Sequence, residues 1–483
     1  MNADDLKSPL LTDLYQLTMA YGYWQQQKHL EKAVFHLYFR KLPFDGGYAV
    51  AAGVDPALEY IDQFCFGDDE IQYLSELTGN DGRQLFSPQF LQYLANLKLS
   101  CNVEAVLEGA IVFPNEPLLR VEGTIIECQL LETALLNLIN FSTLVATKSA
   151  RICHAAAGDP VLEFGLRRAQ GPDGGVTASR AAYIGGCVGT SNVLAGKRYG
   201  IPVKGTHAHS WVMSFDDEQA AFEAYASAMP NNCIFLVDTF DTLEGVRKAC
   251  RVARKLQESG HEMVGIRLDS GDLAYLSIQS RKILDEAGLG DARIVASNDL
   301  DESVIESLKQ QGAKVDVWGV GTKLATAYDQ PALGGVYKLG AIWDQEASTW
   351  KPKIKRSEQL IKTSIPGRLQ TRRFTDSGGQ LLGDMIFDVE LGVPANNMVD
   401  PMEPLRRKAF SFDAEYEDQL TPGVTNGIKV REPEELDCIR LKVMDRLKKL
   451  DASHLRLLNP HVYPVGIEDN LSILRLKMLE NQK

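Results

Sequence analysis

The chain of 483 residues lacks closely spaced cysteines. Its eight cysteines are spread along the sequence, and the nearest two, Cys233 and Cys250, are 17 positions apart. This spacing excludes C-x-x-C metal motifs and the dense disulfide frameworks of small secreted domains. We therefore expect reduced thiols and a cytoplasmic protein.

Long apolar runs are also missing. The most apolar stretch, residues 130–144, is interrupted by Glu132, Asn137 and Asn140, whereas a membrane-spanning helix needs about 20 consecutive apolar residues. The first five residues are acidic or polar apart from Met1 and Ala3 and lack the basic and apolar regions of a secretory signal. We expect neither a signal peptide nor a membrane span.

Positive charge is in deficit. The chain has 51 Lys and Arg against 64 Asp and Glu, a formal net charge of −13. Nucleic acids and membrane surfaces are bound by basic faces, so neither is an expected partner, although cations that cluster locally can still bind a small anion. The composition, 45% hydrophobic and 24% charged, is ordinary for a soluble enzyme of two or three domains.

Two histidines at a spacing of two lie in the middle of the chain. His207 and His209 follow an apolar run, residues 201–203, and the pair Gly205-Thr206. Side chains two apart in an extended segment share one side, so both imidazoles are expected at the mouth of a strand end. Imidazole exchanges a proton or accepts a transferred group near neutral pH. The alternatives are buried structural histidines or a metal pair, for which no third zinc ligand is evident.

From about residue 160 onward, short apolar runs alternate with helical segments. The runs lie at residues 160–162, 201–203, 233–235, 263–265, 293–295, 315–317 and 335–337. This alternation indicates a parallel sheet with right-handed crossovers. Polar residues or glycines follow nearly every run, and in a closed barrel such strand ends meet on one face. We predict an irregular (β/α) barrel, with a doubly wound open sheet as second choice because it concentrates the chemistry at one switch point.

The flanking regions combine short helices and strands. We predict an N-terminal α+β domain over residues 1–150, the barrel over 151–345, and a C-terminal segment over 346–483 that packs with the N-terminal domain. One long helix is expected over residues 127–157.

Two strand ends carry groups suited to phosphates and sugars. The turn at residues 319–322 (GVGT) has the type of backbone whose N–H groups cradle a phosphate, although it matches neither the Rossmann nor the Walker pattern. Arg267 offers a guanidinium to an anion, while Asp269 and Asp272 offer carboxylates to a sugar diol or to Mg²⁺. Structural ion pairs at a domain joint are the alternative for these three residues.

The run that ends at Asp238 and Thr239 partly resembles the pyrophosphate-sugar loop of type I phosphoribosyltransferases. The second acid and the glycine pair of that loop are missing here. We interpret this segment as a strand end that contacts phosphate or ribose.

In their order, these motifs resemble those of nicotinate phosphoribosyltransferases, the type II phosphoribosyltransferases that form nicotinate mononucleotide for NAD synthesis. The resemblance covers about the first 340 residues. The motifs are residues 10–16 (LLTDLYQ), 163–172 (EFGLRRAQGP), 208–210 (AHS), 267–272 (RLDSGD), 297–298 (SN), 319–322 (GVGT) and 334–339 (GGVYKL).

The resemblance implies a reaction in which nicotinate displaces pyrophosphate from 5-phosphoribosyl-1-pyrophosphate. It further implies Mg²⁺ as cofactor, ATP as a co-substrate whose hydrolysis is coupled to turnover, and a homodimer with shared active sites. The alternatives are the nicotinamide-using relative, for which the 163–168 motif fits less well, and a catalytically silent nucleotide-sensing paralogue. Quinolinate phosphoribosyltransferase is shorter, and an aldolase-type barrel would need an activated lysine, for which Lys204 has no evident partner.

The resemblance also implies roles for individual residues. His209 is the phosphorylated histidine, and Arg267 and Asp269 are catalytic, with Asp269 at the ribose or its Mg²⁺. The other residues are implied to bind the substrates. Phe164, together with Tyr15 of the partner subunit, encloses the pyridine ring, and Arg167 or Arg168 with Ser210 binds the carboxylate and nearby phosphate. Gly319, Gly321 and Thr322 bind the 5′-phosphate, and Lys338 binds the pyrophosphate or ATP.

Overall fold

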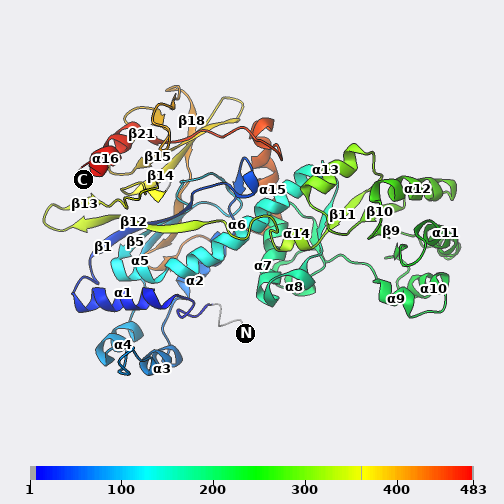
Figure 1. Cartoon of the computed structure of the whole chain (residues 1–483), viewed down its shortest axis with the longest axis horizontal. Helices are drawn as coiled ribbons and strands as arrows, with labels where there is room; N and C mark the ends of the chain where they lie inside the picture. The colour runs from blue at the N-terminus through cyan, green and yellow to red at the C-terminus, as the bar shows by residue number, and fades with distance from the viewer. Residues whose placement is uncertain (1–6, 360–361, 481–483) are drawn as a thin grey trace. The chain divides into compact units, whose positions relative to one another are not determined.

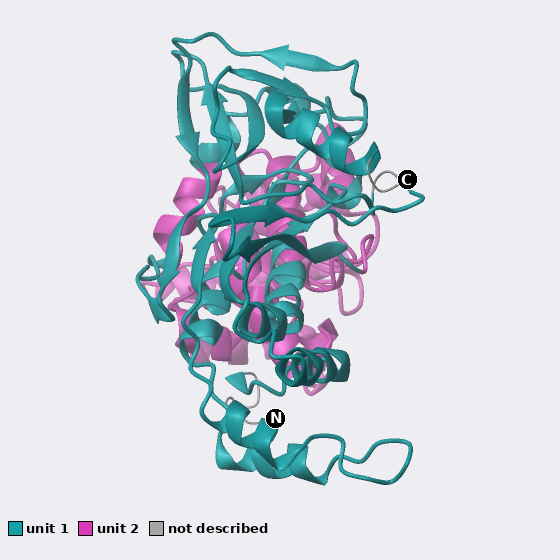
Figure 2. Ribbon diagram, turned by 90° about the vertical axis from the view of Figure 1, so that its left-hand side faces the viewer, with its two compact units in different colours: residues 1–143, 332–435, 445–483 teal, residues 144–331, 436–444 magenta. Residues whose placement is uncertain are grey.

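The computed structural model describes residues 7–359 and 362–480, and the chain divides into two compact units (Figure 2). Unit 1 comprises residues 1–143, 332–435 and 445–483, and unit 2 comprises residues 144–331 and 436–444. The division into three sequence segments stays a prediction. None of the described helices is both long enough and apolar enough to span a membrane.

Unit 2 is built on a parallel sheet of six short strands in the order β7-β6-β11-β10-β9-β8. The strands are β6 (Val161–Glu163), β7 (Gly189–Thr190), β8 (Ile234–Leu236), β9 (Gly265–Leu268), β10 (Arg293–Ala296) and β11 (Val317–Val320). The helices are α7 (Gly171–Ile184), α8 (Val193–Tyr199), α9 (His209–Met213), α10 (Glu218–Ala228), α11 (Thr242–Glu258), α12 (Leu273–Glu286), α13 (Glu302–Gln310) and α14 (Thr322–Ala325). Figure 1 shows α11 and α12 beside β9 and β10. The predicted parallel α/β architecture is confirmed.

The barrel is not confirmed, because the hydrogen-bonded ladders of the described residues form an open sheet. Residues 201–203, predicted as a strand, make only one isolated parallel bridge, between Val203 and Thr190 at the β7 edge. Pro202 has no N–H to give to a ladder, which limits pairing at this point. At the opposite edge the backbone N–H of Leu236 donates to the imidazole of His207. The segment from 203 to 207 therefore contacts both edges of the open sheet.

Unit 1 contains a seven-stranded antiparallel sheet in the order β13-β12-β1-β5-β3-β19-β20. Its strands are β1 (Lys32–Phe39), β3 (Asn102–Ala105), β5 (Leu119–Thr124), β12 (Gly335–Asp344), β13 (Thr349–Pro352), β19 (Thr421–Thr425) and β20 (Ile428–Lys429). The run at residues 335–337, predicted as the last barrel strand, is part of β12 and pairs antiparallel with β1. That prediction was wrong because an apolar run shows that a strand exists but not which sheet it joins.

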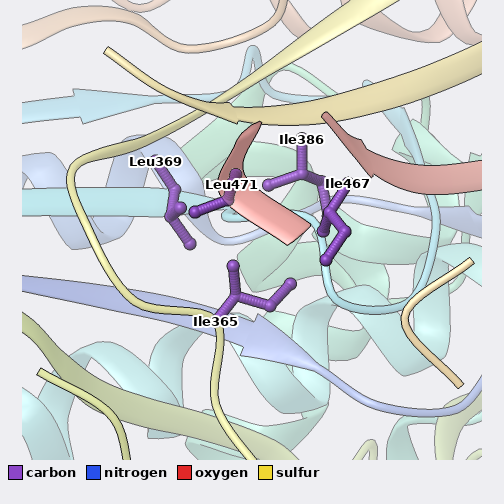
Figure 3. Close-up of a cluster of buried hydrophobic side chains, with 5 residues drawn as sticks. All are labelled: Ile365, Leu369, Ile386, Ile467 and Leu471. Atoms are coloured by element: carbon purple, nitrogen blue, oxygen red, sulfur yellow. The ribbon is translucent and has the colours of Figure 1, made fainter. Parts of the chain in front are cut away.

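A second, six-stranded sheet of unit 1 has the order β17-β16-β21-β15-β14-β18. These strands are β14 (Leu369–Thr375), β15 (Leu381–Asp388), β16 (Asn397–Val399), β17 (Arg407–Ala409), β18 (Glu415–Asp418) and β21 (Val465–Glu468), while β2 (Ala49–Val50) pairs with β4 (Ile111–Val112). A buried cluster joins this sheet to α16 (Asp469–Glu480), as Figure 3 shows for Ile365, Leu369, Ile386, Ile467 and Leu471. Each such side chain contributes roughly 1.5–3 kcal/mol when it is fully buried.

The remaining helices lie outside the parallel sheet and its connections. They are α1 (Leu14–Gln25), α2 (Val54–Asp62), α3 (Asp68–Glu76), α4 (Pro88–Ala95), α5 (Ile125–Leu130), α6 (Glu132–Ala155) and α15 (Leu436–Lys448), with the short 3-10 turns η2 (Pro43–Asp45), η3 (Leu166–Arg168) and η5 (Ala452–His454). The single helix expected over residues 127–157 is instead divided into α5 and α6. Helix α5 begins early because Thr124 and Glu127 form a capping box.

Candidate active site

The polar strand ends of the parallel sheet meet at Arg267, which lies in β9. Its Nε donates to Ser297 Oγ at 2.8 Å, its Nη1 to Thr206 Oγ1 at 3.0 Å, and its Nη2 to Asp269 Oδ1 at 2.9 Å. Ser297 follows β10, and Thr206 lies in the loop that leads to α9. Since parallel strands end at one edge of their sheet, residues far apart in the sequence gather there.

Two carboxylates follow the adjacent strands β8 and β9. Asp238 Oδ2 accepts the backbone N–H of Asp269 at 2.9 Å and the hydroxyl of Ser270 at 2.6 Å. Asp269 Oδ1 accepts from Arg267 and from the hydroxyl of Ser297. Asp238 Oδ1 is buried and has no hydrogen-bond partner among the described residues. A buried carboxylate oxygen of this kind requires a cationic or proton-donating neighbour.

His209 faces both carboxylates. Its Nε2 lies 3.9 Å from Asp238 Oδ1 and 3.9 Å from Asp269 Oδ2, and the side chain is 39% exposed. Its Nδ1 lies 3.0 Å from Thr239 Oγ1. Two negative oxygens on one side of the ring favour a proton on Nε2, which leaves the lone pair on Nδ1, where the Thr239 hydroxyl donates. In this tautomer Nδ1 is the ring nitrogen of His209 that carries the lone pair.

His207, in contrast, is buried. Its ring centroid lies 4.9 Å from that of Tyr225, and its Nε2 accepts the N–H of Leu236 at 3.2 Å. Burial lowers the pKa of His207 to about 4, so the ring is neutral. The prediction that both imidazoles lie at the mouth was wrong, because His209 begins helix α9 and so leaves the extended segment.

We expect His36 and His207 to contribute less to the free energy of unfolding as the pH falls from about 6.5 to about 4. Burial lowers the pKa of His36 to about 3 and that of His207 to about 4, and both imidazoles accept a backbone N–H. Because their folded-state pKa lies below the unfolded value, their stabilisation is present above the unfolded pKa and is lost as the pH falls toward the folded pKa. At pH 5 the loss is at most about 2 kcal/mol per histidine.

Urea unfolding at pH 7 and pH 5 measures this loss. The variant His207→Gln has one titrating group fewer and should lose less stability than the wild-type chain over the same interval. An equal loss in both proteins would contradict the contribution of His207.

Phe164 follows β6 and lies against the glycines of β11. The guanidinium carbon of Arg267 is 5.7 Å from the centre of its ring. A Cβ on Gly319 would come within 2.7 Å of the Phe164 ring, and a Cβ on Gly321 would lie 3.2 Å from its carbonyl oxygen. At position 319 a Cβ would overlap the Phe164 ring, so glycine is needed there for the backbone to approach Phe164 this closely, whereas the contact at position 321 is tight but milder.

The buried carboxylate of Glu163 holds the turn that carries Phe164. It accepts the backbone N–H of Gly165, the hydroxyl of Ser179 at 2.9 Å and the hydroxyl of Thr190 at 2.5 Å. Since these donors come from the turn, α7 and β7, they fix the exit of β6. The glutamate of the 163–168 motif is thus a supporting residue beneath the site.

The structure brings six of the predicted site residues together in unit 2. They are Phe164, His209, Arg267, Asp269, Gly319 and Gly321. Of the other predicted residues in unit 2, Arg167 and Arg168 are exposed in η3, Ser210 is exposed in α9, and Thr322 begins α14. The neighbouring Lys323 is paired with Asp301, so part of its charge is already balanced.

Two predicted residues belong to unit 1. Tyr15 is 49% exposed on α1, and its pKa is raised by burial and by the charges of Glu132 and Asp13. Lys338 lies half-buried in β12 and donates to the carbonyl oxygen of Tyr337 at 2.7 Å. Burial lowers its pKa.

The second carboxylate of the site is not the one that the sequence led us to expect. Asp272 caps the N-terminus of α12, where it accepts the N–H of Tyr275 at 3.0 Å. The second carboxylate beside Asp269 is Asp238, which the sequence marked only as a strand-end acid. Among the described residues, no three His, Cys, Asp or Glu side chains form a metal cage. Two carboxylate oxygens do suit Mg²⁺, which keeps most of its ligands as water and phosphate oxygen.

Comparison with known proteins identifies the family. Family models match residues 10–140 (nicotinate phosphoribosyltransferase N-terminal domain), 160–384 (nicotinate phosphoribosyltransferase family) and 368–475 (nicotinate phosphoribosyltransferase C-terminal domain). The chain is 44% identical to the nicotinate phosphoribosyltransferase of Bacillus subtilis, over 95% of this chain and 93% of that protein. The chain belongs to the nicotinate phosphoribosyltransferase family.

Other members of the nicotinate phosphoribosyltransferase family support the same assignment. The Homo sapiens protein of that name is 36% identical over 96% of this chain and 96% of its own length. The crystal structure of human nicotinic acid phosphoribosyltransferase matches with a TM-score of 0.84 at 34% identity, covering 97% of this chain and 99% of that one. A nicotinate-nucleotide pyrophosphorylase from Pyrococcus furiosus shares the fold, with a TM-score of 0.71 at 23% identity and coverage of 93% and 97%. The relationship therefore extends beyond residue 340, where the motifs end.

Proposed function

We propose that the protein transfers the phosphoribosyl group of 5-phosphoribosyl-1-pyrophosphate to nicotinate, as a step of NAD biosynthesis. Its products are nicotinate mononucleotide and pyrophosphate, and ATP hydrolysis is coupled to turnover through a phosphohistidine at His209. The observation that carries the proposal is the placement of His209, with Nε2 facing two fixed carboxylates and Nδ1 at the Thr239 hydroxyl.

In the transfer step, the pyridine nitrogen forms a bond to the anomeric carbon of the ribose while the bond from that carbon to the pyrophosphate oxygen breaks. Positive charge develops on the sugar and negative charge on the leaving pyrophosphate, so catalysis is chiefly charge stabilisation. Asp269 lies at the sugar, where its carboxylate stabilises the positive charge. When bound, Mg²⁺ would neutralise the leaving pyrophosphate, and Asp269 would hold it through the phosphate and water ligands that Mg²⁺ keeps.

The nicotinate ring lies against Phe164 and is enclosed by Tyr15 of the partner subunit in a homodimer. Arg267 has five N–H donors, of which three are used by Ser297, Thr206 and Asp269. The remaining donors can meet the nicotinate carboxylate, together with Arg167 or Arg168 and Ser210. Gly319, Gly321 and Thr322 bind the 5′-phosphate through backbone N–H groups. The family resemblance assigns Lys338 to the pyrophosphate or ATP.

In the coupled step, His209 Nδ1 attacks the terminal phosphorus of ATP. The Nδ1–P bond forms as the P–O bond to ADP breaks, and hydrolysis later returns free histidine and phosphate. Asp238 and Asp269 hold the proton on Nε2 and stabilise the positive charge that the ring gains. The phosphate adds negative charge beside the substrate phosphates, which rearranges the site and favours turnover.

We also infer that the open sheet of unit 2 acts as an irregular barrel, in which the segment from 203 to 207 occupies the gap between β7 and β8. The contacts of this segment with both sheet edges support the inference. The absence of a membrane-spanning helix among the described residues is compatible with action in the cytoplasm.

The experiment that tests the function measures product formation by the purified protein with 5-phosphoribosyl-1-pyrophosphate and Mg²⁺. Nicotinate or nicotinamide is offered, each with and without ATP. We expect nicotinate mononucleotide, formed faster with ATP. Preference for nicotinamide would refute the substrate assignment, and no product from either base would indicate a silent, nucleotide-sensing protein.

The substitution Gly319→Ala is expected to raise the KM for nicotinate by about tenfold, because the new Cβ displaces the Phe164 ring from the base. The matched control is Gly290→Ala, at an exposed glycine where a Cβ would meet nothing within 4 Å. Steady-state kinetics with nicotinate as the varied substrate measure both variants. Equal KM values would show that the close approach of Gly319 to Phe164 has no part in base binding.

A further inference from the structure

His209 lies between two anchored residues, each two positions away along the chain. On one side, His207 Nε2 accepts the N–H of Leu236 at 3.2 Å. On the other side, the indole N–H of Trp211 donates to the carbonyl oxygen of Ala221 in α10 at 3.1 Å. The segment that carries His209 is therefore fastened at both of its ends.

The anchor at His207 is a rigid one. The residue is 7% exposed, and its ring lies among the rings of Phe222, Tyr225 and Phe235. A backbone N–H can only donate, so Nε2 must carry a lone pair and the proton must lie on Nδ1, which is 3.4 Å from the carbonyl oxygen of Ala208. Without this acceptor the N–H of Leu236 would be a buried, unpaired donor.

The hydrogen bond between His207 and Leu236 aligns the 207–209 segment with the residues that contact the ring of His209. Leu236 bonds to His207, and two and three positions further along, Asp238 and Thr239 lie at Nε2 and Nδ1 of His209. A shift of the His207 bond would move both ring nitrogens of His209 relative to Asp238 and Thr239. The bond thus fixes the spacing between two segments whose side chains perform the proposed phosphoryl transfer.

We propose that His207 is a positioning residue for phosphoryl transfer, which sets the register of the 207–209 segment against β8 and so selects the ring nitrogen that His209 presents to ATP. This inference rests on the proposed role of His209 as phosphoryl acceptor. His207 itself touches no substrate, and its Nε2 is occupied by the amide of Leu236.

The test compares His207→Gln with His207→Asn, which differ by one methylene. The amide oxygen of glutamine can reach the place of Nε2 and accept the N–H of Leu236, whereas the shorter asparagine ends near the place of Nδ1. Three quantities are measured: the rate of His209 phosphorylation by ATP, the rate of ATP-independent phosphoribosyl transfer, and the tautomer of His209 by ¹⁵N NMR of the ring nitrogens.

We expect His207→Asn to lower the phosphorylation rate by at least about tenfold, since a displacement of about 1 Å costs up to ~10²-fold. ATP-independent transfer should stay within about twofold of wild type, His209 should lose its uniform Nε2–H tautomer, and His207→Gln should restore both properties. Two results would overturn the inference: both variants behaving as wild type, or both losing the two activities together, as expected of a general packing residue.

The NMR measurement separates this inference from the proposed function. If the wild-type chain is not phosphorylated by ATP, the phosphohistidine step of the proposed function fails, and the role of His207 in phosphoryl transfer fails with it. The register claim is then still decided by the tautomer of His209: a change in His207→Asn that is restored in His207→Gln supports it, and an unchanged tautomer overturns it.

Discussion

Replacing His209 with alanine is expected to abolish the stimulation of nicotinate mononucleotide formation by ATP. Phosphoryl incorporation should fall by more than about a thousandfold, because the substitution removes the nucleophile itself. Some ATP-independent transfer should remain, since Arg267, Asp269 and Phe164 are still in place. The measurement is the initial rate of product formation with and without ATP, in parallel with the amount of phosphate bound to the protein.

The matched control is His261→Ala. His261 also belongs to unit 2, but its imidazole lies 2.9 Å from the side chain of Asn231 and not at the site. Its ATP stimulation should equal that of the wild-type chain. Stimulation that survived in His209→Ala would remove the acceptor role from His209, and the buried ring of His207 would be a poor substitute because its Nε2 is already bonded.

The substitution Arg267→Ala is expected to lower kcat/KM for nicotinate by about ten- to a hundredfold. A hydrogen bond to a charged group contributes about 1.5–3 kcal/mol, and about 1.4 kcal/mol corresponds to a factor of ten. The loss has two sources: the nicotinate carboxylate loses a donor, and Asp269 Oδ1 loses one of its two donors, the one at 2.9 Å. Steady-state kinetics with either substrate varied measure the effect.

Arg251→Ala is the control for Arg267→Ala. The side chain of Arg251 is 45% exposed and pairs with Glu244 on the surface of α11. Exposed ion pairs of this kind contribute about 0–1 kcal/mol, so its kcat/KM should stay within about twofold of wild type. An unchanged kcat/KM in Arg267→Ala as well would show that Arg267 forms only a structural ion pair with Asp269.

The sequence predicted the parallel sheet of unit 2 because apolar runs and helical segments alternate at a regular interval. The sequence did not predict how the two edge strands of this sheet are connected. The edges at Thr190 and Leu236 are joined by a segment that contains Pro202 and Gly205 and has no periodic pattern. Such a connection is specified by tertiary contacts, among them the burial of His207, which local patterns do not record.

For the carboxylates of the site, the sequence likewise did not show which side chains lie together. Asp269 and Asp272 are close in the sequence, yet Asp272 caps α12 and the partner of Asp269 is Asp238, at the end of the adjacent strand β8. Neighbouring parallel strands bring their ends together even where about 30 residues separate them. The acidic end of the run before Thr239 was the only signal of Asp238 in the sequence.

The most direct test of the phosphohistidine is to treat the intact protein with ATP and Mg²⁺ and to locate the bound phosphate by ³¹P NMR and by peptide mapping under alkaline conditions, in which phosphohistidine is stable. We predict a single phosphohistidine, on the peptide that contains His209 and attached at Nδ1. Phosphate on another residue, attachment at Nε2, or no bound phosphate would contradict the arrangement in which Asp238 and Asp269 hold the Nε2 proton of His209.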